Sequence, residues 1–265
     1  MNSLEHSYYR YMRFDPEAIS AIQSFYLKFF KDSQTVLDLG CGRGEFLKLL
    51  AEEGKMVQGV DSDEEMVKDV KGKGLPVIQA DVFEYLKTTK SKFDGIFCAH
   101  LIEHLSFDRA LELLSLCSEV MKKDGSLVLV CPNPSSLEVQ LQDFWREPTH
   151  IRMYNRELLE FLLDLAGFEI CESGENPKNR ASPTLSSRLT RLEQEVSEHL
   201  REIRDEKHLS PLARLKRRIA MMLISTISRQ FMREIDAIDR NFQAIRELVE
   251  SYYPSKEIYV CGRRR

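Results

Sequence analysis

Short apolar runs alternate with amphipathic helical patterns from residue 15 to residue 171, and this alternation limits the fold more than any other feature of the chain. Buried strands bounded by turns are predicted over 35–39, 56–60, 76–80, 95–98, 126–130 and 168–171. Because a helical pattern separates most of these strands, we expect an α/β domain with a mostly parallel sheet and helices on both faces. A ligand of such a sheet binds at the carboxyl ends of its strands.

The sequence changes character after a polar linker at 173–183. Apolar residues then recur at heptad-like spacing as far as Tyr252, and Pro254 stops the pattern. We therefore predict a long helical or coiled-coil hairpin over 179–254. The β-branched run at 257–261 predicts one more strand, which returns to the sheet. The expected organisation is a first domain over 1–178, the helical insertion over 179–254, and the final strand with a basic tail over 255–265.

Composition narrows the class of protein. Lysine and arginine total 38 against 42 acidic residues, so the chain has no overall basic bias of the kind that binds nucleic acid without specificity. The six cysteines form no C-x-x-C pair, and no apolar run is long enough to span a membrane. We expect a cytoplasmic protein with reduced thiols.

A glycine loop follows the first predicted strand. Asp38 stands near the end of that strand, and Gly40, Gly42 and Gly44 form G-x-G-x-G before a helix. Glycines allow backbone N–H groups to approach a ligand closely. The spacing differs from the dinucleotide fingerprint G-x-G-x-x-G. A tight turn without a ligand is the alternative for the loop taken alone.

Two further acids follow the next strands. Asp61 ends the second strand, 17 residues after Gly44, where an acid can bind both hydroxyls of a ribose. Asp81 ends the third strand, where a side chain can bind an adenine amino group. In the order and spacing of these motifs, residues 30–171 resemble the class I S-adenosylmethionine-dependent methyltransferases. The resemblance extends to 258–261 as the final, antiparallel strand of that Rossmann-like sheet.

The resemblance implies S-adenosylmethionine as the cofactor and places its parts. The glycine loop would contact the methionine part and Asp61 the ribose, with Asp81 and Val82 near the adenine. Arg13 is a candidate for the donor carboxylate, with a solvated arginine as the alternative. The full expected donor set is Asp38, Gly40, Gly42, Gly44, Asp61, Ser62, Asp81, Val82, Ala99 and Arg13.

Histidines and an acid follow the fourth strand. If the segment His100-Leu-Ile-Glu103-His104 is helical, all three polar residues face one side, and His150 comes later in the chain. Together they predict a divalent metal site at His100, Glu103, His104 and His150. His104 or His150 acting as a plain base, with Glu103 beside them, is equally consistent, and so is a structural role in which Glu103 and His104 only cap a helix.

This segment also resembles the E-x-x-E-H motif of small-RNA ribose methyltransferases and ubiquinone-pathway O-methyltransferases, which are metal-assisted. Here His100 replaces the first acid, which disfavours magnesium because magnesium prefers oxygen ligands.

The stretch 143–154 contains Trp145, Arg146 and Arg152, a composition that suits a sugar or a phosphorylated acceptor; a buried aromatic loop is the alternative. The combination C-G-R-G-E-F-L, E-H-L, P-N-P-S and P-T-H-x-R resembles methyltransferases of prokaryotic surface-polysaccharide and glycan synthesis. That resemblance implies a sugar hydroxyl as the acceptor.

The predicted hairpin has its own expected partners. Its heptad stripe favours a homo-oligomer. A basic cluster at 214–218 precedes an apolar run at 220–224, which suits peripheral contact with the inner membrane surface and a lipid-linked glycan acceptor. Binding of a nucleic-acid backbone is a further alternative.

Three functions follow. The first is O-methylation of a sugar hydroxyl in a glycan or polysaccharide precursor, with His104 or His150 as base. The second is a metal-assisted RNA ribose 2′-O-methyltransferase. The third is a non-catalytic, donor-binding scaffold protein.

Overall fold

The structure, a computed structural model, describes residues 11–12, 14–180 and 254–265. The chain divides into two compact units, one formed by 1–180 with 254–265 and the other by 181–253. The predicted hairpin, with its expected oligomer and membrane contacts, lies outside the described residues, and so does Arg13. Within the described part, no helix is long and apolar enough to cross a membrane.

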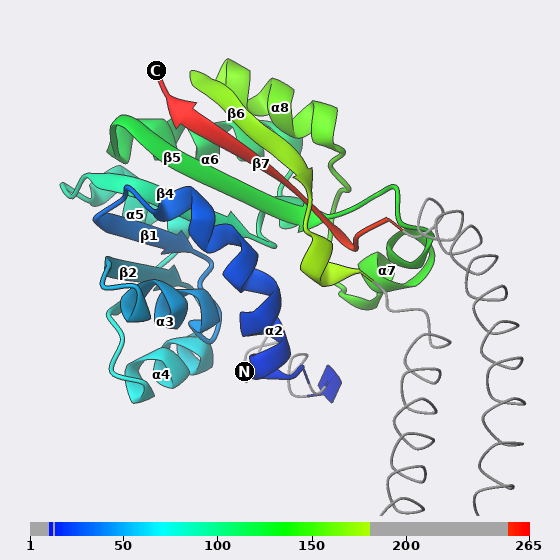
Figure 1. The fold of residues 1–265 in the computed structure, drawn as a ribbon, viewed down its shortest axis with the longest axis horizontal. Coiled ribbons are helices and arrows are strands. Elements are labelled where there is room, and N and C mark those ends of the chain that lie inside the picture. Colours follow the sequence, from blue (N-terminus) through cyan, green and yellow to red (C-terminus); the bar gives the residue numbers. More distant parts are fainter. Residues whose placement is uncertain (1–10, 13, 181–253) are drawn as a thin grey trace, which may run out of the picture. The chain divides into compact units, whose positions relative to one another are not determined.

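Seven strands form one sheet in the order β3-β2-β1-β4-β5-β7-β6 (Figure 1). All neighbours pair in parallel except β7, which is antiparallel to both β5 and β6. The expected Rossmann-like methyltransferase sheet with an antiparallel last strand is therefore confirmed. The strands are β1 Thr35–Leu39, β2 Met56–Asp61, β3 Val77–Gln79, β4 Phe93–Ala99, β5 Met121–Pro132, β6 Phe168–Glu175 and β7 Glu257–Arg264.

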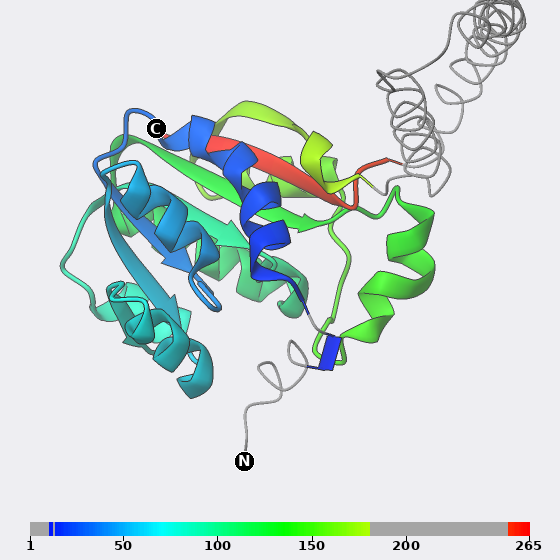
Figure 2. The same ribbon diagram turned by 60° about the horizontal axis from the view of Figure 1, so that its bottom comes forward.

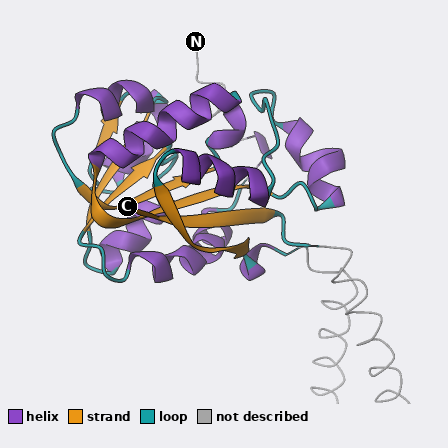
Figure 3. Cartoon of the chain, turned by 90° about the horizontal axis from the view of Figure 1, so that it is seen from above, coloured by secondary structure: helices purple, strands orange, loops and turns teal. Residues whose placement is uncertain are grey.

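Helices connect the strands and cover both faces of the sheet, which gives the three layers seen in Figure 3. The α-helices are α2 Pro16–Gln23, α3 Glu45–Glu52, α4 Glu64–Gly72, α5 Val82–Thr88, α6 Phe107–Val120, α7 Phe144–Arg146 and α8 Arg156–Leu165. Shorter or irregular turns are η1 Ser24–Phe30, η2 Ile102–His104, η3 Val139–Asp143 (a π-helix) and η4 Pro177–Asn179.

Alternation along each strand divides the core between the two faces. Val36 and Phe97 belong to a cluster with the aromatic side chains of η1 and α3, on the face that α2 crosses in Figure 2. Leu37 and Ile96, one position away in each strand, belong to the larger cluster with α5, α6 and α8. The buried sheet is thus held from both sides, and its carboxyl edge is left for the loops.

The helix starts agree with the local sequence signals. Asp15 caps α2 by accepting from the N–H of Glu17, and Pro16 takes the first helical position. β5 is longer than the predicted 126–130 because its first residue, Met121, pairs with Phe93 and its last, Pro132, pairs with Glu257. These pairings involve distant residues that an apolar run cannot reveal.

Candidate active site

The glycine loop leaves β1 at the carboxyl edge of the sheet. Gly40, Gly42 and Gly44 have φ values of 67°, 52° and 77°, in the left-handed region that favours glycine. A Cβ added to Gly42 would meet no atom within 4 Å, whereas one added to Gly40 would touch the side chain of Leu101. The loop is therefore open at Gly42, where a ligand can approach the backbone.

Two buried carboxylates lie beside this loop. Asp61 Oδ2 accepts from Gly42 N at 2.8 Å, and Oδ1 accepts from Asp63 N at 2.9 Å. Burial raises the pKa of Asp61, although these backbone bonds oppose the rise. Burial, followed by the charges of Asp61 and Glu45, raises the pKa of Asp38 well above its usual range. A cationic ligand such as a sulfonium would be stabilised next to this pair of acids.

The other expected donor residues are placed around the same edge. Asp81 is exposed and caps α5, its Oδ1 accepting from Phe83 N and Glu84 N, so one carboxylate oxygen is committed to the helix. Val82 is buried in the first turn of α5, Ser62 is exposed after β2, and Ala99 is the half-buried last residue of β4. Their contacts with a donor stay predictions.

His100 differs from the expectation that it shares a helical face with Glu103 and His104. It precedes η2, in a left-handed conformation with φ 52°. Its Nδ1 lies 3.2 Å from Glu103 Oε1 and its Nε2 lies 3.4 Å from Glu257 Oε2. Desolvation lowers the pKa of His100, but the two carboxylates outweigh it and raise the pKa to about 10. A ring engaged on both sides in this way is not placed as a metal ligand.

Glu103, His104 and His150 do come together. One ligand atom from each lies within 4.8 Å of the others. Glu103 is fully buried, and its Oε2 has no hydrogen-bond partner among the described residues. Glu147, which the sequence reasoning missed, places its carboxylate 3.8 Å from His104 Nε2 and 3.5 Å from His150 Nε2. We call Glu103, His104, Glu147 and His150 the histidine–glutamate cluster.

Backbone bonds explain how Glu103 and His150, which are 47 positions apart, come together. The carbonyl of Glu103 accepts from Ile151 N at 2.9 Å and Arg152 N at 3.1 Å. The ring of His150 stacks at 4.6 Å on Phe144, and its Nδ1 lies 2.6 Å from the Phe144 carbonyl. That contact requires Nδ1 to carry the proton, which leaves Nε2 with a lone pair facing the cluster.

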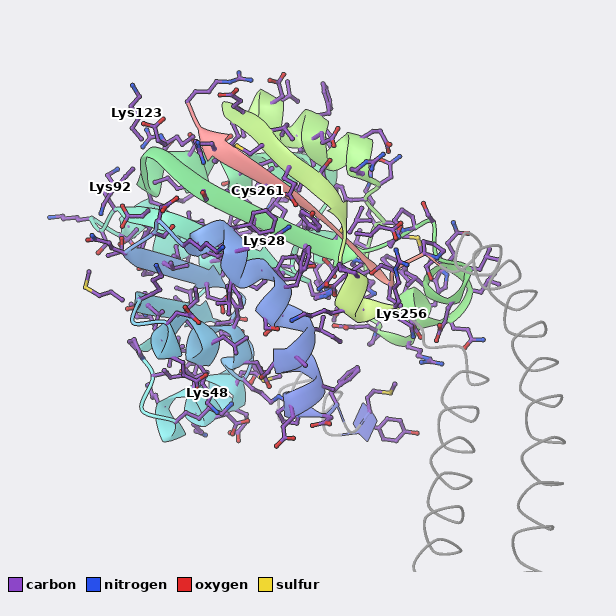
Figure 4. All side chains as sticks on the ribbon, in the orientation of Figure 1. Lys28, Lys48, Lys92, Lys123, Lys256 and Cys261 are labelled. Carbon is purple, nitrogen blue, oxygen red and sulfur yellow. The ribbon has the colours of Figure 1, made fainter. Side chains whose placement is uncertain are left out.

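A cavity of about 420 Å³ opens beside the cluster. Its apolar wall is formed by Met12, Phe14, Ile19, Ile22, Pro132, Val139 and Phe144. Its polar lining is formed by Gln23, His100, Asp143, Arg146, Glu147, His150, Asn179, Lys256 and Glu257. Lys256 (Figure 4), the residue before β7, bonds Glu138 and Asp143, so it holds the η3–α7 segment at the cavity.

The expected role of Trp145 and Arg152 in acceptor binding does not fit this cavity. Trp145 is 69% exposed, its Nε1 donates to the Gln140 carbonyl, and it is not part of the lining. The guanidinium of Arg152 lies over the rings of Phe107 and Tyr154. Arg146 of the same stretch does line the cavity, as do Glu147 and Glu257, and Glu257 lies outside the stretch that the sequence pointed to.

Comparison with known proteins agrees with the fold and the glycine loop described above. A family model described as a methyltransferase domain matches residues 9–173. An S-adenosylmethionine-dependent methyltransferase from Archaeoglobus fulgidus is 28% identical with a TM-score of 0.64, covering 99% of this chain and 100% of that one.

Curated relatives match shorter segments. (S)-coclaurine N-methyltransferase of Papaver somniferum is 40% identical over 106 residues, which is 37% of this chain and 29% of that protein. A probable S-adenosylmethionine-dependent methyltransferase of Mycolicibacterium smegmatis is 32% identical over 136 residues, 51% of this chain and 52% of that protein. The matched segments thus span about a third to a half of these relatives. The strand order, the glycine loop and the family match together place the chain among the class I S-adenosylmethionine-dependent methyltransferases.

Proposed function

We propose that this protein transfers the methyl group of S-adenosylmethionine to a hydroxyl of a sugar ring in a glycan precursor. The observation that carries the proposal is the histidine–glutamate cluster at the edge of the cavity. A hydroxyl acceptor needs a base or a metal to remove its proton, whereas a thiol or amine acceptor needs less help. The cavity also has the size of a small-molecule site, and its mixed apolar and polar lining suits a sugar ring.

His150 is the base in this proposal. The hydroxyl oxygen attacks the methyl carbon, the carbon–sulfur bond breaks, and S-adenosylhomocysteine leaves with the electron pair. The hydroxyl proton passes to Nε2 of His150, because Nδ1 is already bonded to the Phe144 carbonyl. Glu147 Oε2, 3.5 Å from that Nε2, then stabilises the imidazolium. Alignment of donor and acceptor supplies the rest of the acceleration.

The cluster also fits a divalent cation. The buried Oε2 of Glu103 has no hydrogen-bond partner within the described part of the chain, and a cation would satisfy it. Glu103, His104 and His150 would hold such an ion, and two imidazoles with a carboxylate suit manganese, iron or zinc better than magnesium. Bound there, the ion would take the lone pair of His150 Nε2, because Nδ1 is bonded to the Phe144 carbonyl. It would then lower the pKa of the acceptor hydroxyl in place of His150 acting as the base.

The acceptor is tested with the full-length protein and methyl-labelled S-adenosylmethionine. A panel of free and nucleotide-linked monosaccharides is compared with short RNAs. We expect label on the sugars, and a loss of turnover of about 100-fold or more in His150→Ala, the range for a lost general base. Donor affinity should be unchanged. Ile151→Ser, an exposed neighbour, is the control. Label on RNA alone would contradict the sugar acceptor and favour the ribose methyltransferase, and turnover on neither would favour the scaffold.

The cation is tested separately by calorimetric titration with Zn²⁺ and Mn²⁺, with Mg²⁺ for comparison. We expect saturable binding of Zn²⁺ or Mn²⁺ that weakens at least about 10-fold in Glu103→Gln, since it removes a charged ligand. Wild-type protein that binds none of these ions would leave His150 as a base without a metal. Turnover in the presence of a chelator would then be undiminished.

A further inference from the structure

Glu257 is the first residue of β7, and only 2% of it is exposed. Its Oε1 accepts from Tyr26 Oη at 2.5 Å and from Asn176 Nδ2 at 2.7 Å. Its Oε2 accepts from Asn179 Nδ2 at 2.6 Å and lies 3.4 Å from His100 Nε2. A buried carboxylate is stable only when its oxygens are hydrogen-bonded. The carboxylate of Glu257 therefore has partners from η1, from η4 with its cap residue, and from the residue that follows β4. The pairing of β7 with its neighbouring strands uses backbone groups and needs none of these side-chain bonds.

His100 lines the cavity together with Asn179 and Glu257, and its side chain is much more exposed than that of Glu257. Its left-handed backbone is rare for a residue other than glycine and persists only where the surroundings hold it. Its N–H is bonded to the Val130 carbonyl, and its two ring nitrogens face Glu103 and Glu257. The side chain is nevertheless 44% exposed, and it lines the cavity. The backbone and both ring nitrogens of His100 are thus held in place, and the exposed part of its ring can contact a ligand in the cavity.

The network continues from His100 into the histidine–glutamate cluster. Glu103 uses Oε1 for His100, and its Oε2, with no hydrogen-bond partner among the described residues, remains for the cluster. Among the described residues, the contact with His100 Nδ1 is therefore the hydrogen bond that sets the rotation of the Glu103 carboxylate. The orientation of the Glu103 carboxylate within the cluster therefore depends on the ring of His100, and that ring is held on its other side by Glu257.

We propose that Glu257 is a positioning residue that acts through His100, holding the imidazole at the cavity and, through it, the carboxylate of Glu103 beside His104 and His150. The inference rests on the proposed function, because that function assigns the acceptor to this cavity. It adds that the first residue of β7, which comes after 181–253 in the chain, helps to orient the groups that contact the acceptor.

The first experiment needs no acceptor. Ring-nitrogen NMR signals of His100 are recorded in the full chain and assigned by their loss in His100→Asn. Glu257→Gln should shift the Nε2 signal of His100 and leave the affinity for S-adenosylmethionine within about twofold of wild type. Glu172→Gln is the matched control, because Glu172 bonds Tyr259 and Lys28 away from the cavity. An unchanged His100 signal in Glu257→Gln would overturn the proposal whatever the acceptor is.

The second experiment measures turnover on whichever monosaccharide of the panel the wild type methylates. Glu257→Gln should lower kcat about 10- to 100-fold, the range for a hydrogen-bond partner behind a working group, with the KM for the donor unchanged. The double variant Glu257→Gln/His100→Asn should lose no more kcat than the more impaired of the two single variants, since the effects of coupled residues do not add. Losses that multiply would mean that Glu257 does not act through His100.

A third variant separates positioning from stability. Tyr26→Phe removes one bond to Glu257 and leaves its contact with His100. It should lower Tm while retaining kcat. Loss of kcat in Tyr26→Phe equal to that in Glu257→Gln would reduce Glu257 to a structural role. If the wild type methylates no sugar, the proposed function fails, and the His100 signal still decides the positioning.

Discussion

The glycine loop and the acceptor cavity both place buried carboxylates at the carboxyl edge of the sheet, and they satisfy those carboxylates in different ways. Beside the loop, Asp61 accepts from two backbone N–H groups that lie within about 20 residues of it. Beside the cavity, Glu257 and one oxygen of Glu103 are held by side chains, and His100 lies between the two carboxylates. A backbone N–H donor remains after any substitution at its position except proline, whereas a side-chain partner is lost with its side chain. The hold on Asp61 therefore does not depend on the side chains of its partners, whereas the hold on Glu103 and Glu257 can be altered residue by residue.

The largest effect is expected from Asp61→Ala, which should break the donor side alone. Affinity for S-adenosylmethionine should fall about 100-fold or more, because charge-assisted hydrogen bonds to two ribose hydroxyls are worth about 1.5–3 kcal/mol each. Zn²⁺ or Mn²⁺ titration should be unchanged. Calorimetry checks both, with Asp108→Asn, an exposed residue of α6, as control. Loss of cation binding in the same variant would show that the two regions are not independent.

A smaller effect on donor affinity is expected from a substitution in the glycine loop, and it tests whether the loop contacts the donor. Gly42 and Gly54 both have positive φ, and a Cβ on either would meet no atom within 4 Å. Replacement by alanine should therefore cost each variant about 1–2 kcal/mol of folding stability. Only Ala at position 42 projects a methyl group into the expected donor site, so donor affinity should fall about 10-fold further there, a change of about 1.4 kcal/mol. Equal donor affinity in the two variants would place the donor elsewhere.

The smallest expected effect is on folding stability, and it comes from Asp94, which lies in neither the glycine loop nor the cavity. Asp94 accepts from Thr35 and Gln34 and pairs with Lys122. Partial burial raises its pKa, but these partners outweigh it and lower the pKa to about 2. The lowered pKa stabilises the fold by about 1 kcal/mol after allowance for solvent. That stability is present above about pH 4 and is lost as the pH falls towards 2. In denaturation experiments Asp94→Asn should therefore be less stable at pH 7, with the difference narrowing in acid and donor affinity unchanged.

The same contrast explains what the sequence could predict. The strands and the glycine loop are local features, so apolar runs and glycine spacing located them within a few residues. His100 was expected on a helix with Glu103 and His104, because spacing alone cannot show that the residue after β4 has a left-handed backbone. Glu257 carried no signal at all, since Tyr26, Asn176 and Asn179 give it its environment only after folding.

The position of β7 between β5 and β6 has a consequence during synthesis. When Glu175 has been made, β6 exists but its partner strand does not, since about 80 residues separate it from Glu257. At about 5–20 residues per second the ribosome needs about 4–16 s to make them. Through that interval one edge of β5 and both edges of β6 lack a partner strand, and unpaired edges can pair with other chains. Synthesis of β7 then completes the sheet and also supplies Glu257, the carboxylate that contacts His100. A chain that ends before β7 would lack both the strand and this carboxylate.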